Sequence, residues 1–232
     1  IYAPVRVFGT STIVTNGDQT DTIREGLAAG KTFAQASTPG PLSPTPPTTP
    51  PVSPLVKKNG DYTLSILKSA DGDPASCRRY FFAYEAPRAG QGHFIHTYMG
   101  DGTPLPSFVG EPEQVEIPCG TPAELADLLW DSLNAENKVS LFVRYIDRKT
   151  GDWETVIKTS MHQPDGRRRP PQIYTVRGRP AAAAHLTEVY RNDRTGTEIR
   201  LQPQPEAGPH FYDRGRASDR GTQRQAGLYQ LL

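Results

Sequence analysis

A tract of closely spaced prolines is the feature that most limits what this chain can fold into. Eight of the sixteen residues from Pro39 to Pro54 are proline, and most of the others are serine or threonine. Proline fixes its φ angle and lacks the backbone N–H that a sheet requires. The tract therefore predicts a polyproline-type or disordered connector, no part of which enters a sheet.

The C-terminal part of the chain differs in composition from the rest. From Asp165 to Leu232 there are 12 arginines, no lysine and 7 acidic residues, a net charge of +5, whereas residues 1–164 carry −4. This composition, without a hydrophobic period, predicts a largely disordered tail at residues 161–232, with a weak helix or strand tendency at Ala181–Tyr190. Residues 1–160 then form the folded domain, interrupted by a proline-rich segment at residues 37–56.

Charge and cysteine content exclude several classes of protein. The net charge of the whole chain is +1, which indicates neither a nucleic acid nor a membrane as a partner. Because the sequence has no long apolar run and no leader, we expect a soluble, cytoplasmic protein. Cys77 and Cys119 are too few for a disulfide framework or a zinc site, and we expect both to be reduced and buried. The sequence begins at Ile1 with residues typical of a strand, so we expect the first elements of a larger domain to be missing.

Strands are predicted where β-branched and aromatic residues recur between turn residues. One of these strands ends at Asn16-Gly17, a pair typical of chain reversals. The predicted strands are Val5–Phe8, Thr12–Thr15, Tyr62–Lys68, Arg79–Tyr84, His93–Met99, Val139–Ile146 and Trp153–Lys158, the last two joined by a turn at Asp147–Asp152.

Two helices are predicted from capping signals. Thr22 and Glu25 have the spacing of a capping box, which predicts a helix from there to about Ala36. The sequence Thr121-Pro122-Ala123-Glu124 combines an N-cap residue, a proline at the first helical position and the capping acid. The helix that follows should bury one stripe, made of Leu125, Leu128, Leu129 and Leu133. Helices and mainly antiparallel strands together predict an α+β fold.

Three passages carry a resemblance to a known family. They are YAPVRVFGTSTIVTNGDQTDTIREGLAAGKTF at Tyr2–Phe33, GHFIHTYMGDGTPLPSFVGEP at Gly92–Pro112 and NKVSLFVRYIDRKTG at Asn137–Gly151. They resemble the stand-alone, archaeal-type IMP cyclohydrolase family over about Ile1–Lys158. That resemblance implies an N-terminal-nucleophile-hydrolase-like αββα sandwich, incomplete here, and closure of the ribonucleotide FAICAR to IMP with loss of water in de novo purine biosynthesis. It also implies a purine nucleotide partner, no cofactor and the possibility of a homo-oligomer.

Two departures from the family pattern lower the activity expected of this chain. Members of the family begin with a further basic region, which this sequence lacks. At the position of Pro39–Pro54, relatives have a sequence close to TRTFEPDAPNYTPRISA. Translation of codons for that sequence in a frame shifted by one nucleotide can give the residues present here. We therefore interpret the tract as an out-of-frame segment, with the frame restored at Leu55, and expect this chain to be inactive in ring closure.

The resemblance also implies catalytic residues. Tyr2 and Asn16 stand where the family places functional polar residues, at the head of the first strand and the end of the second. Without the resemblance, Asn16 would be read as a positive-φ turn residue before Gly17, and Tyr2 as an interface aromatic. His96 is a candidate for proton transfer, although a strand histidine is more often structural.

Substrate-binding residues are expected around these positions. Thr20 and Asp21 open a helix whose N-terminus could hold an anion, and Thr20 is the better phosphate ligand because a carboxylate would repel phosphate. Arg6 could contact the phosphate or the carboxamide, or remain a solvated strand residue. The other two candidates, Tyr98 and Asp101, lie with His96 on or just beyond the predicted strand His93–Met99. No metal site is predicted, because the DGD sequence at residues 71–73 lacks the spacing of a calcium loop.

Two other function classes remain open. The proline tract could dock into aromatic grooves of adaptor domains, which would make the chain an interaction scaffold. The fold could instead serve as a non-catalytic nucleotide-binding relative. The arginines of the tail are interspersed with acids and predict no specific nucleic-acid site.

Overall fold

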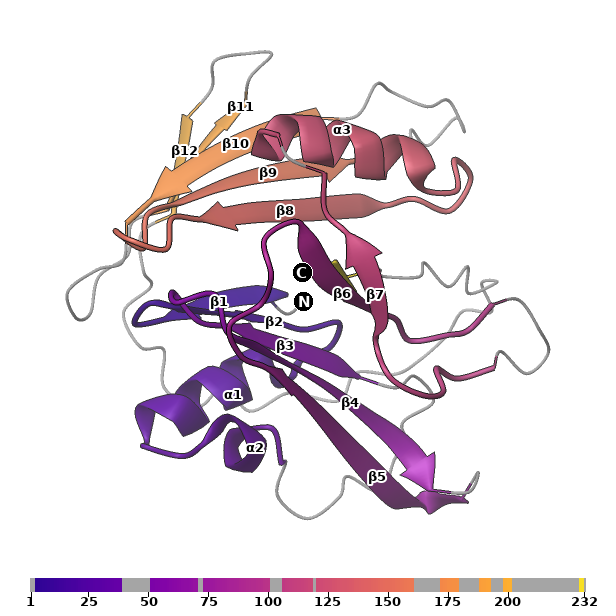
Figure 1. The fold of residues 1–232 in the computed structure, drawn as a ribbon. Coiled ribbons are helices and arrows are strands. Elements are labelled where there is room, and N and C mark those ends of the chain that lie inside the picture. The colour runs from indigo at the N-terminus through magenta and orange to yellow at the C-terminus, as the bar shows by residue number, and fades with distance from the viewer. Residues whose placement is uncertain are drawn as a thin grey trace, which may run out of the picture. The chain divides into compact units, whose positions relative to one another are not determined.

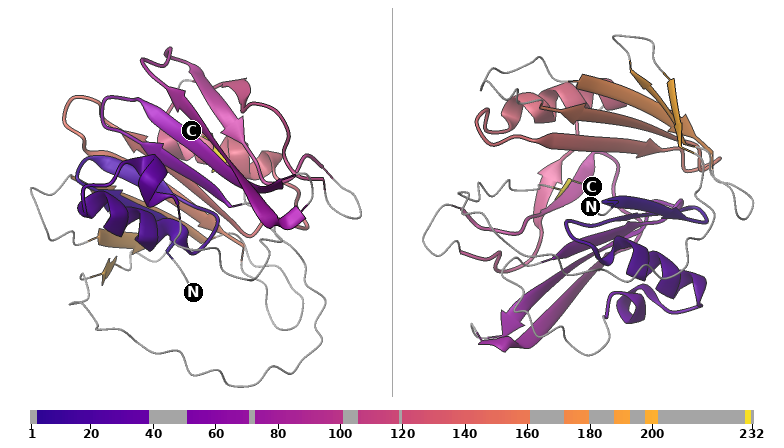
Figure 2. Two further views of the ribbon diagram at one scale, coloured as in Figure 1. Left: turned by 90° about the horizontal axis from the view of Figure 1, so that it is seen from below. Right: turned by 180° about the vertical axis from the view of Figure 1, so that it is seen from behind.

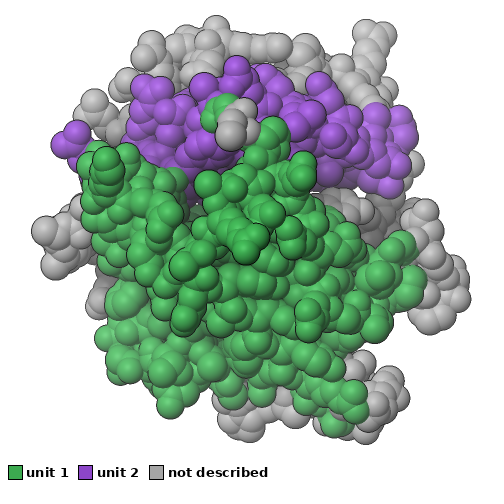
Figure 3. Space-filling model, viewed as in Figure 1, with its two compact units in different colours: residues 1–120, 146–152, 227–232 green, residues 121–145, 153–226 purple. Residues whose placement is uncertain are grey.

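The fold was analysed in a computed structural model, which describes residues 3–38, 51–70, 73–100, 106–118, 120–160, 172–179, 188–192, 198–201 and 230–231. The chain divides into two compact units (Figure 3). Unit 1 comprises residues 1–120, 146–152 and 227–232, and unit 2 comprises residues 121–145 and 153–226. Helices and antiparallel sheets make up both units, which confirms the α+β class; the αββα sandwich stays a prediction.

Unit 1 is built on a five-stranded antiparallel sheet in which the strands follow one another in chain order (Figure 1). Four of its strands contain or closely match segments that the sequence predicts. The fourth and fifth are longer than predicted, because their pairing continues to a bulge next to Ser69. The strands are β1 (Val5–Phe8), β2 (Ser11–Val14), β3 (Val52–Val56), β4 (Tyr62–Ala70) and β5 (Asp73–Tyr84).

The third strand corrects the expectation that the proline tract stays out of the sheet. Val52, Ser53 and Pro54 all belong to β3, where Pro54 lies opposite Leu64 of β4. The pairing of β3 with β2 covers only its last two residues, Leu55 and Val56. Pro54 is therefore paired on one side only, the position in which a sheet tolerates a residue without an N–H. Residues 39–50 lie outside the described residues.

Two helices cover one face of this sheet, where the sequence predicted one (Figure 2). Helix α1 (Gln19–Ala28) begins three residues before the predicted capping box, and α2 (Phe33–Ala36) follows a break at Gly30, whose φ is +80°. Glycine adopts this left-handed conformation readily, which ends the first helix. A capping box does form, but at Thr32. The helices bury Ile23 and Ala36 against Ile13 and Leu55 of the sheet.

A second, small sheet packs against the other face. It consists of β6 (Gln91–Ile95), β7 (Glu113–Glu116) and β13 (Gln230–Leu231) in the order β13-β6-β7. The predicted strand His93–Met99 thus ends at Ile95, although an isolated bridge pairs Tyr98 with Ser107 further on. The core between the two sheets contains Val52, Tyr62, Leu64, Ile66, Ile95 and Phe108.

In its described residues, unit 2 contains one helix and a five-stranded antiparallel sheet. Helix α3 (Pro122–Ser132) has the predicted capping box between Thr121 and Glu124. The predicted leucine stripe is wrong at Leu128, which is 52% exposed, because Trp130 occupies the buried face of the helix instead. The strands of the sheet are β8 (Ser140–Ile146), β9 (Trp153–Thr159), β10 (Gln172–Gly178), β11 (Glu188–Asn192) and β12 (Glu198–Leu201), in the order β12-β11-β10-β9-β8.

The sheet of unit 2 continues past the predicted hairpin. β8 and β9 are neighbours joined by the turn at Asp147–Asp152, as predicted. β10 lies in the segment expected to be disordered, yet it pairs with β9 at seven positions, from Gln172 opposite Thr159 to Gly178 opposite Trp153. Its tyrosine and β-branched residues, Ile173–Val176, were the strand signal that the arginine-rich and proline-rich composition of the tail obscured. Within the described residues, no helix combines the length and the apolar character needed to cross a bilayer.

Candidate functional site

Asn16 directly follows β2 and ties three segments together. Its side-chain Nδ2 donates to the Thr97 hydroxyl at 2.8 Å, and its Oδ1 accepts from the Val52 N–H at 2.7 Å. Its own backbone N–H donates to the Val52 carbonyl at 3.2 Å. The interpretation of Asn16 as a positive-φ turn residue is wrong, because Ala86 alone among the described non-glycine residues has a positive φ. The side chain is instead fixed at both ends of its amide.

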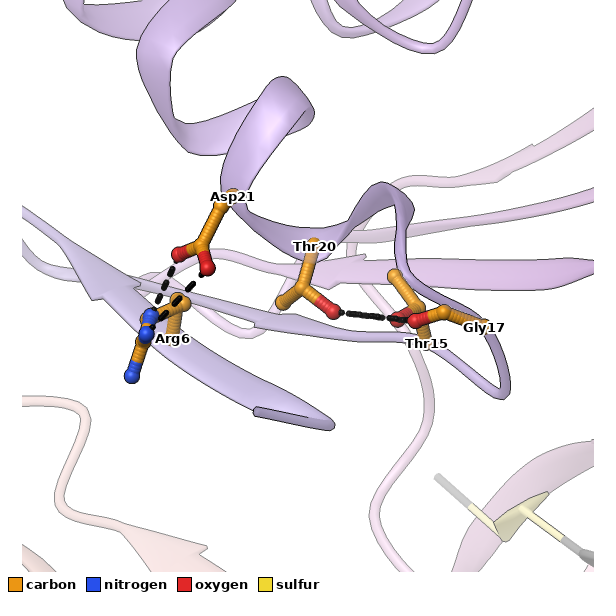
Figure 4. Close-up of polar contacts among 5 residues, drawn as sticks. All are labelled: Arg6, Thr15, Gly17, Thr20 and Asp21. Carbon is orange, nitrogen blue, oxygen red and sulfur yellow. Dashed lines mark hydrogen bonds and ion pairs between the residues drawn. The ribbon is translucent and has the colours of Figure 1, made fainter. Parts of the chain in front are cut away.

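Buried hydroxyl groups surround the start of α1, next to Asn16. The hydroxyls of Thr15 and Thr20 contact one another, and that of Thr15 donates to the Gly17 carbonyl at 2.8 Å (Figure 4). Thr20 is 1% exposed, so its hydroxyl points into the fold. Gln19 donates from Nε2 to the hydroxyl of Ser53 at 3.1 Å. These bonds hold the first turn of the helix against β2 and β3.

Arg6 and Asp21, both predicted to contact substrate, bind each other. The guanidinium Nε lies 2.6 Å from Oδ1 of the carboxylate, and Nη2 lies 3.2 Å from Oδ2 (Figure 4). Two parallel bonds of this kind are the strong, oriented form of an arginine–carboxylate contact. The pair joins β1 to α1, and both side chains remain partly exposed. Any phosphate bound by Arg6 must therefore compete with Asp21.

His96 is buried between two aromatic side chains. Its ring stacks on Phe94 at 4.9 Å and meets the edge of Phe108 at 4.8 Å between centroids. Nδ1 donates to the backbone carbonyl of Tyr98, and Nε2 lies 3.3 Å from Oε1 of Glu113. With Nδ1 bound to a carbonyl, Nε2 is the nitrogen available for proton exchange, and its partner is Glu113.

Thr97, which is not among the predicted site residues, connects two of the passages that carry the family resemblance. Thr97 is buried and accepts the hydrogen bond from Asn16. Its neighbour His96 contacts Phe94, Phe108 and Glu113 instead. Alternation along a strand predicts that the side chains of His96 and Thr97 point to opposite faces. No local pattern predicts the bond between Thr97 and Asn16, because the two residues lie 81 positions apart in the chain.

Two predicted residues, Tyr2 and Asp101, lie outside the described residues. Tyr98 is described and contributes its backbone carbonyl to His96 and a bridge to Ser107. Cys77, expected to be buried, is a free cysteine of intermediate exposure, and Cys119 is outside the described residues. In the part of the chain that the structure describes, no three His, Cys, Asp or Glu side chains come together as metal ligands would.

A second polar cluster lies at the other end of β3, where Val56 pairs with Tyr62. The Tyr62 hydroxyl lies 2.6 Å from Nδ1 of His93, and Tyr84 stacks on the His93 ring at 3.7 Å between centroids. Burial raises the pKa of Tyr62 to about 12 and lowers the pKa of His93. The pKa of Tyr84 is also raised, first by burial and then by the charge of Glu111.

Both groups of the second cluster are neutral near pH 7. The raised pKa of Tyr62 keeps its hydroxyl protonated, the lowered pKa of His93 keeps the ring uncharged, and the hydroxyl and Nδ1 share a hydrogen bond. Nothing in the sequence pattern singled out these residues, because they come from three separate strands. The arrangement ties the two sheets of unit 1 together.

An open hollow of about 450 Å³ lies where β6 begins and β7 ends. Of the predicted site residues that the structure describes, none lines this hollow. Its lining comprises Ala89, Gly90, Gln91, Glu116, Ile117 and Pro118.

Comparison with known proteins gives one match. A family model described as "IMP cyclohydrolase-like protein" matches residues 1–151. No curated protein and no solved structure gives a significant match. The matched residues include Asn16, Thr97, His96 and the Arg6–Asp21 pair, and they end in the turn between β8 and β9.

Proposed function

The chain belongs to the IMP cyclohydrolase-like family, and from that premise we propose that its site is built to close FAICAR to IMP with loss of water. We propose further that this chain binds the purine nucleotide without completing ring closure. The reason is our interpretation that the tract at Pro39–Pro54 stands in place of a substrate-site segment that would supply an acid and an arginine.

The chemistry sets the requirements. The carboxamide nitrogen of the substrate forms a bond to the formyl carbon and loses one proton. The formamido nitrogen loses the second proton as it forms a double bond to the same carbon, and the formyl oxygen takes up both protons and leaves as water. The site must therefore hold the nitrogen against the carbon, donate hydrogen bonds to the oxygen as it gains charge, and move protons. Holding the two groups in contact can supply most of the rate enhancement.

The double anchoring of Asn16 is the observation that carries this proposal. An amide held by the Val52 N–H on its oxygen and by Thr97 on its nitrogen cannot rotate without breaking a bond. Such a preorganised amide costs no reorganisation when charge develops on a nearby oxygen. We assign Asn16 to that role, with Thr97 as its positioning residue.

The remaining roles follow from the geometry around Asn16. We propose that the substrate phosphate displaces Asp21 from Arg6, so that the guanidinium binds the phosphate and the ion pair closes again in its absence. Thr20 would then orient α1 rather than touch the substrate, because its hydroxyl is buried. His96, through Glu113, is proposed as the proton carrier. Tyr2 remains a proposed catalytic residue, and Tyr98 and Asp101 remain proposed substrate-binding residues.

Thermal unfolding of the full chain with the nucleotide AICAR tests the binding. A ligand at about 100 times its Kd should stabilise the protein by about 2.7 kcal/mol. Asp21→Asn should strengthen binding because the phosphate no longer competes with a carboxylate, and Arg6→Gln should weaken it. The matched control is Glu154→Gln, which breaks the ion pair with Arg177 in unit 2 and should leave AICAR binding unchanged.

Incubation with FAICAR, followed by IMP absorbance, tests the chemistry. We expect AICAR binding without IMP formation. Robust IMP formation would contradict the inactive assignment, and no stabilisation by AICAR would contradict the nucleotide site. In the second case, binding of the Pro39–Pro54 peptide to adaptor domains would support the interaction-scaffold alternative.

A further inference from the structure

The tripeptide Asn-Gly-Asp occurs twice in this chain, at residues 16–18 and 59–61. An asparagine followed by glycine can change spontaneously, because glycine has no side chain to hinder its backbone nitrogen. That nitrogen loses its proton and bonds to Cγ of the asparagine, and the side-chain NH2 takes up a proton and leaves as ammonia. The resulting succinimide ring then opens with water to aspartate or isoaspartate. Because the two tripeptides are identical, the fold must decide which of them reacts.

At residues 16–18, the asparagine amide is held by distant parts of the chain. Its Oδ1 accepts from the Val52 N–H at 2.7 Å, and its Nδ2 donates to the Thr97 hydroxyl at 2.8 Å. Val52 and Thr97 are 2% and 5% exposed, so water cannot readily replace these partners. Ring closure makes Cγ tetrahedral and releases Nδ2, which breaks the bond to Thr97 and distorts the bond to Val52. The fold therefore opposes the reaction at Asn16.

At residues 59–61, the same amide is held by its own turn. Oδ1 of Asn59 accepts from the Asp61 N–H at 3.1 Å, and Nδ2 donates to Oδ2 of Asp61 at 2.6 Å. Asn59 is exposed, so water can replace both partners at little cost. The Gly60 N–H donates to the Lys57 carbonyl at 3.0 Å, within one turn at the surface. Bonds in such turns open readily in the native state, which frees the attacking nitrogen.

The groups beside the two glycines also differ. A Cβ built on Gly60 would lie 3.0 Å from Nε of Arg148, so the guanidinium lies next to the peptide that reacts. The attacking nitrogen and the oxygen of the intermediate carry negative charge, which a neighbouring cation stabilises. At Gly17, the atom nearest to a built Cβ is instead Oε1 of Gln19. An amide oxygen gives negative charge no such support.

Conversion of Asn59 changes the bonding of Asp61. The Asp61 carboxylate also accepts from the Ala86 N–H at 3.0 Å, and this bond joins the turn to the residues that follow β5. The pKa of Asp61 is lowered first by the bond from Ala86 and then by the bond from Asn59. A carboxylate at position 59 replaces that second donor with a like charge. Isoaspartate also lengthens the backbone of the turn between β3 and β4.

We propose that Asn59 is a site of spontaneous deamidation in the folded chain, whereas the fold protects Asn16 in the identical tripeptide. Water is the co-reactant, ammonia is released, and the product is aspartate or isoaspartate in the turn between β3 and β4. This inference is independent of nucleotide binding, because it rests on the bonds of the two asparagines and on no ligand.

Mass spectrometry of the full chain after long incubation in mildly alkaline buffer tests the proposal. Trypsin separates the two sites, because residues 7–24 and 59–68 form peptides with one asparagine each. In the folded chain, Asn59 should convert about tenfold faster than Asn16 or more, because Asn16 must give up buried bonds. In guanidinium chloride, which removes the tertiary environment of both sites, the two rates should be similar.

Arg148→Gln tests the effect of charge. It removes the cation beside Gly60 and should slow the conversion of Asn59. Lys149→Gln is the matched control, because it makes the same change in charge at the neighbouring residue and should leave the rate unchanged.

Thr97→Val tests the protection of Asn16. Valine nearly keeps the volume of threonine but cannot accept from Nδ2, so Asn16 should convert faster while the rate at Asn59 stays the same. Circular dichroism shows whether the variant is folded. Incubation should also lower the melting temperature of the wild type but not that of Asn59→Gln, in which the reactive asparagine is absent.

Equal rates at the two sites of the folded chain, or faster conversion of Asn16, would overturn the proposal. It would also be overturned if Asn59 stayed intact in the folded chain while the unfolded chain converted. A folded Thr97→Val variant in which Asn16 converts no faster would show that its bonds do not protect it.

Discussion

Replacing Asn16 by alanine probes both the frame of the larger sheet and the proposed site. In the structure the Asn16 side chain accepts from the Val52 N–H and donates to Thr97. Alanine removes both bonds. Val52 is 2% exposed, so its N–H would be left without a partner in a place that water hardly reaches.

The expected loss of stability follows from these two bonds. A buried donor left without an acceptor costs about 1 to 3 kcal/mol, and the bond to Thr97 adds about 1 kcal/mol. Asn16→Ala should therefore lower the free energy of unfolding by about 2 to 4 kcal/mol. For a chain of this length the melting temperature should fall by roughly 10 °C.

Urea unfolding followed by circular dichroism measures this loss. The midpoint should fall while the dependence on urea stays unchanged, because the surface exposed on unfolding is nearly the same. Hydrogen exchange at the Val52 amide gives a direct local readout and should become faster. A loss below about 0.5 kcal/mol, with Val52 still protected, would refute the reasoning that this amide is held by Asn16.

Asn16→Asp separates the structural role from the functional one. A carboxylate still accepts from Val52, and the Thr97 hydroxyl can turn to donate to it. We therefore expect Asn16→Asp to keep more than half of the stability that alanine loses. It should nevertheless weaken AICAR binding, because it removes the amide donor and adds a negative charge.

Two further predictions concern pH and packing. Burial lowers the pKa of His93 in the folded state, so the unfolded chain binds a proton at this residue more readily. The contribution of His93 to stability should therefore be complete above the unfolded pKa of about 6.5 and fall as the pH drops below it. His93→Gln should flatten this part of the pH profile measured by urea unfolding, and an unchanged profile would contradict the lowered pKa of His93. A Cβ added at Gly178 would lie 2.2 Å from the Trp153 ring, so Gly178→Ala should destabilise unit 2 by about 1 to 3 kcal/mol. The control is Gly100→Ala, where a Cβ would meet open space and the melting temperature should change little. Equal effects of the two substitutions would argue against the close contact between Gly178 and Trp153.

Several features could be predicted because their cause is local in sequence. The capping box at Thr121 and Glu124 needs only residues three apart, and the structure has it as predicted. The turn at Asp147–Asp152 depends on the same short range. The family resemblance, confirmed over residues 1–151, rests likewise on the order of residues alone.

Features that depend on distant contacts could not be predicted in the same way. After the first helix ends at Gly30, the direction of α2 depends on the sheet, against which Ala36 is buried beside Ile13 and Leu55. Pro54 can belong to β3 because β2 pairs only with Leu55 and Val56, so no N–H is required from Pro54 on that side of the strand. β10 forms because β9 offers it an edge with a matching register. In each case a neighbour far along the chain outweighs the local preference.

For the candidate site, the sequence by itself determined which residues to consider, since the family passages point to Asn16, Arg6, Asp21 and His96. Only the tertiary structure decided what each one touches. It pairs Arg6 with Asp21, turns His96 toward Glu113 and joins Asn16 to Thr97. The physical reason is that a hydrogen bond needs two groups within about 3 Å, and a distance between residues 81 positions apart is set by the packing of the sheets and not by their spacing in the chain.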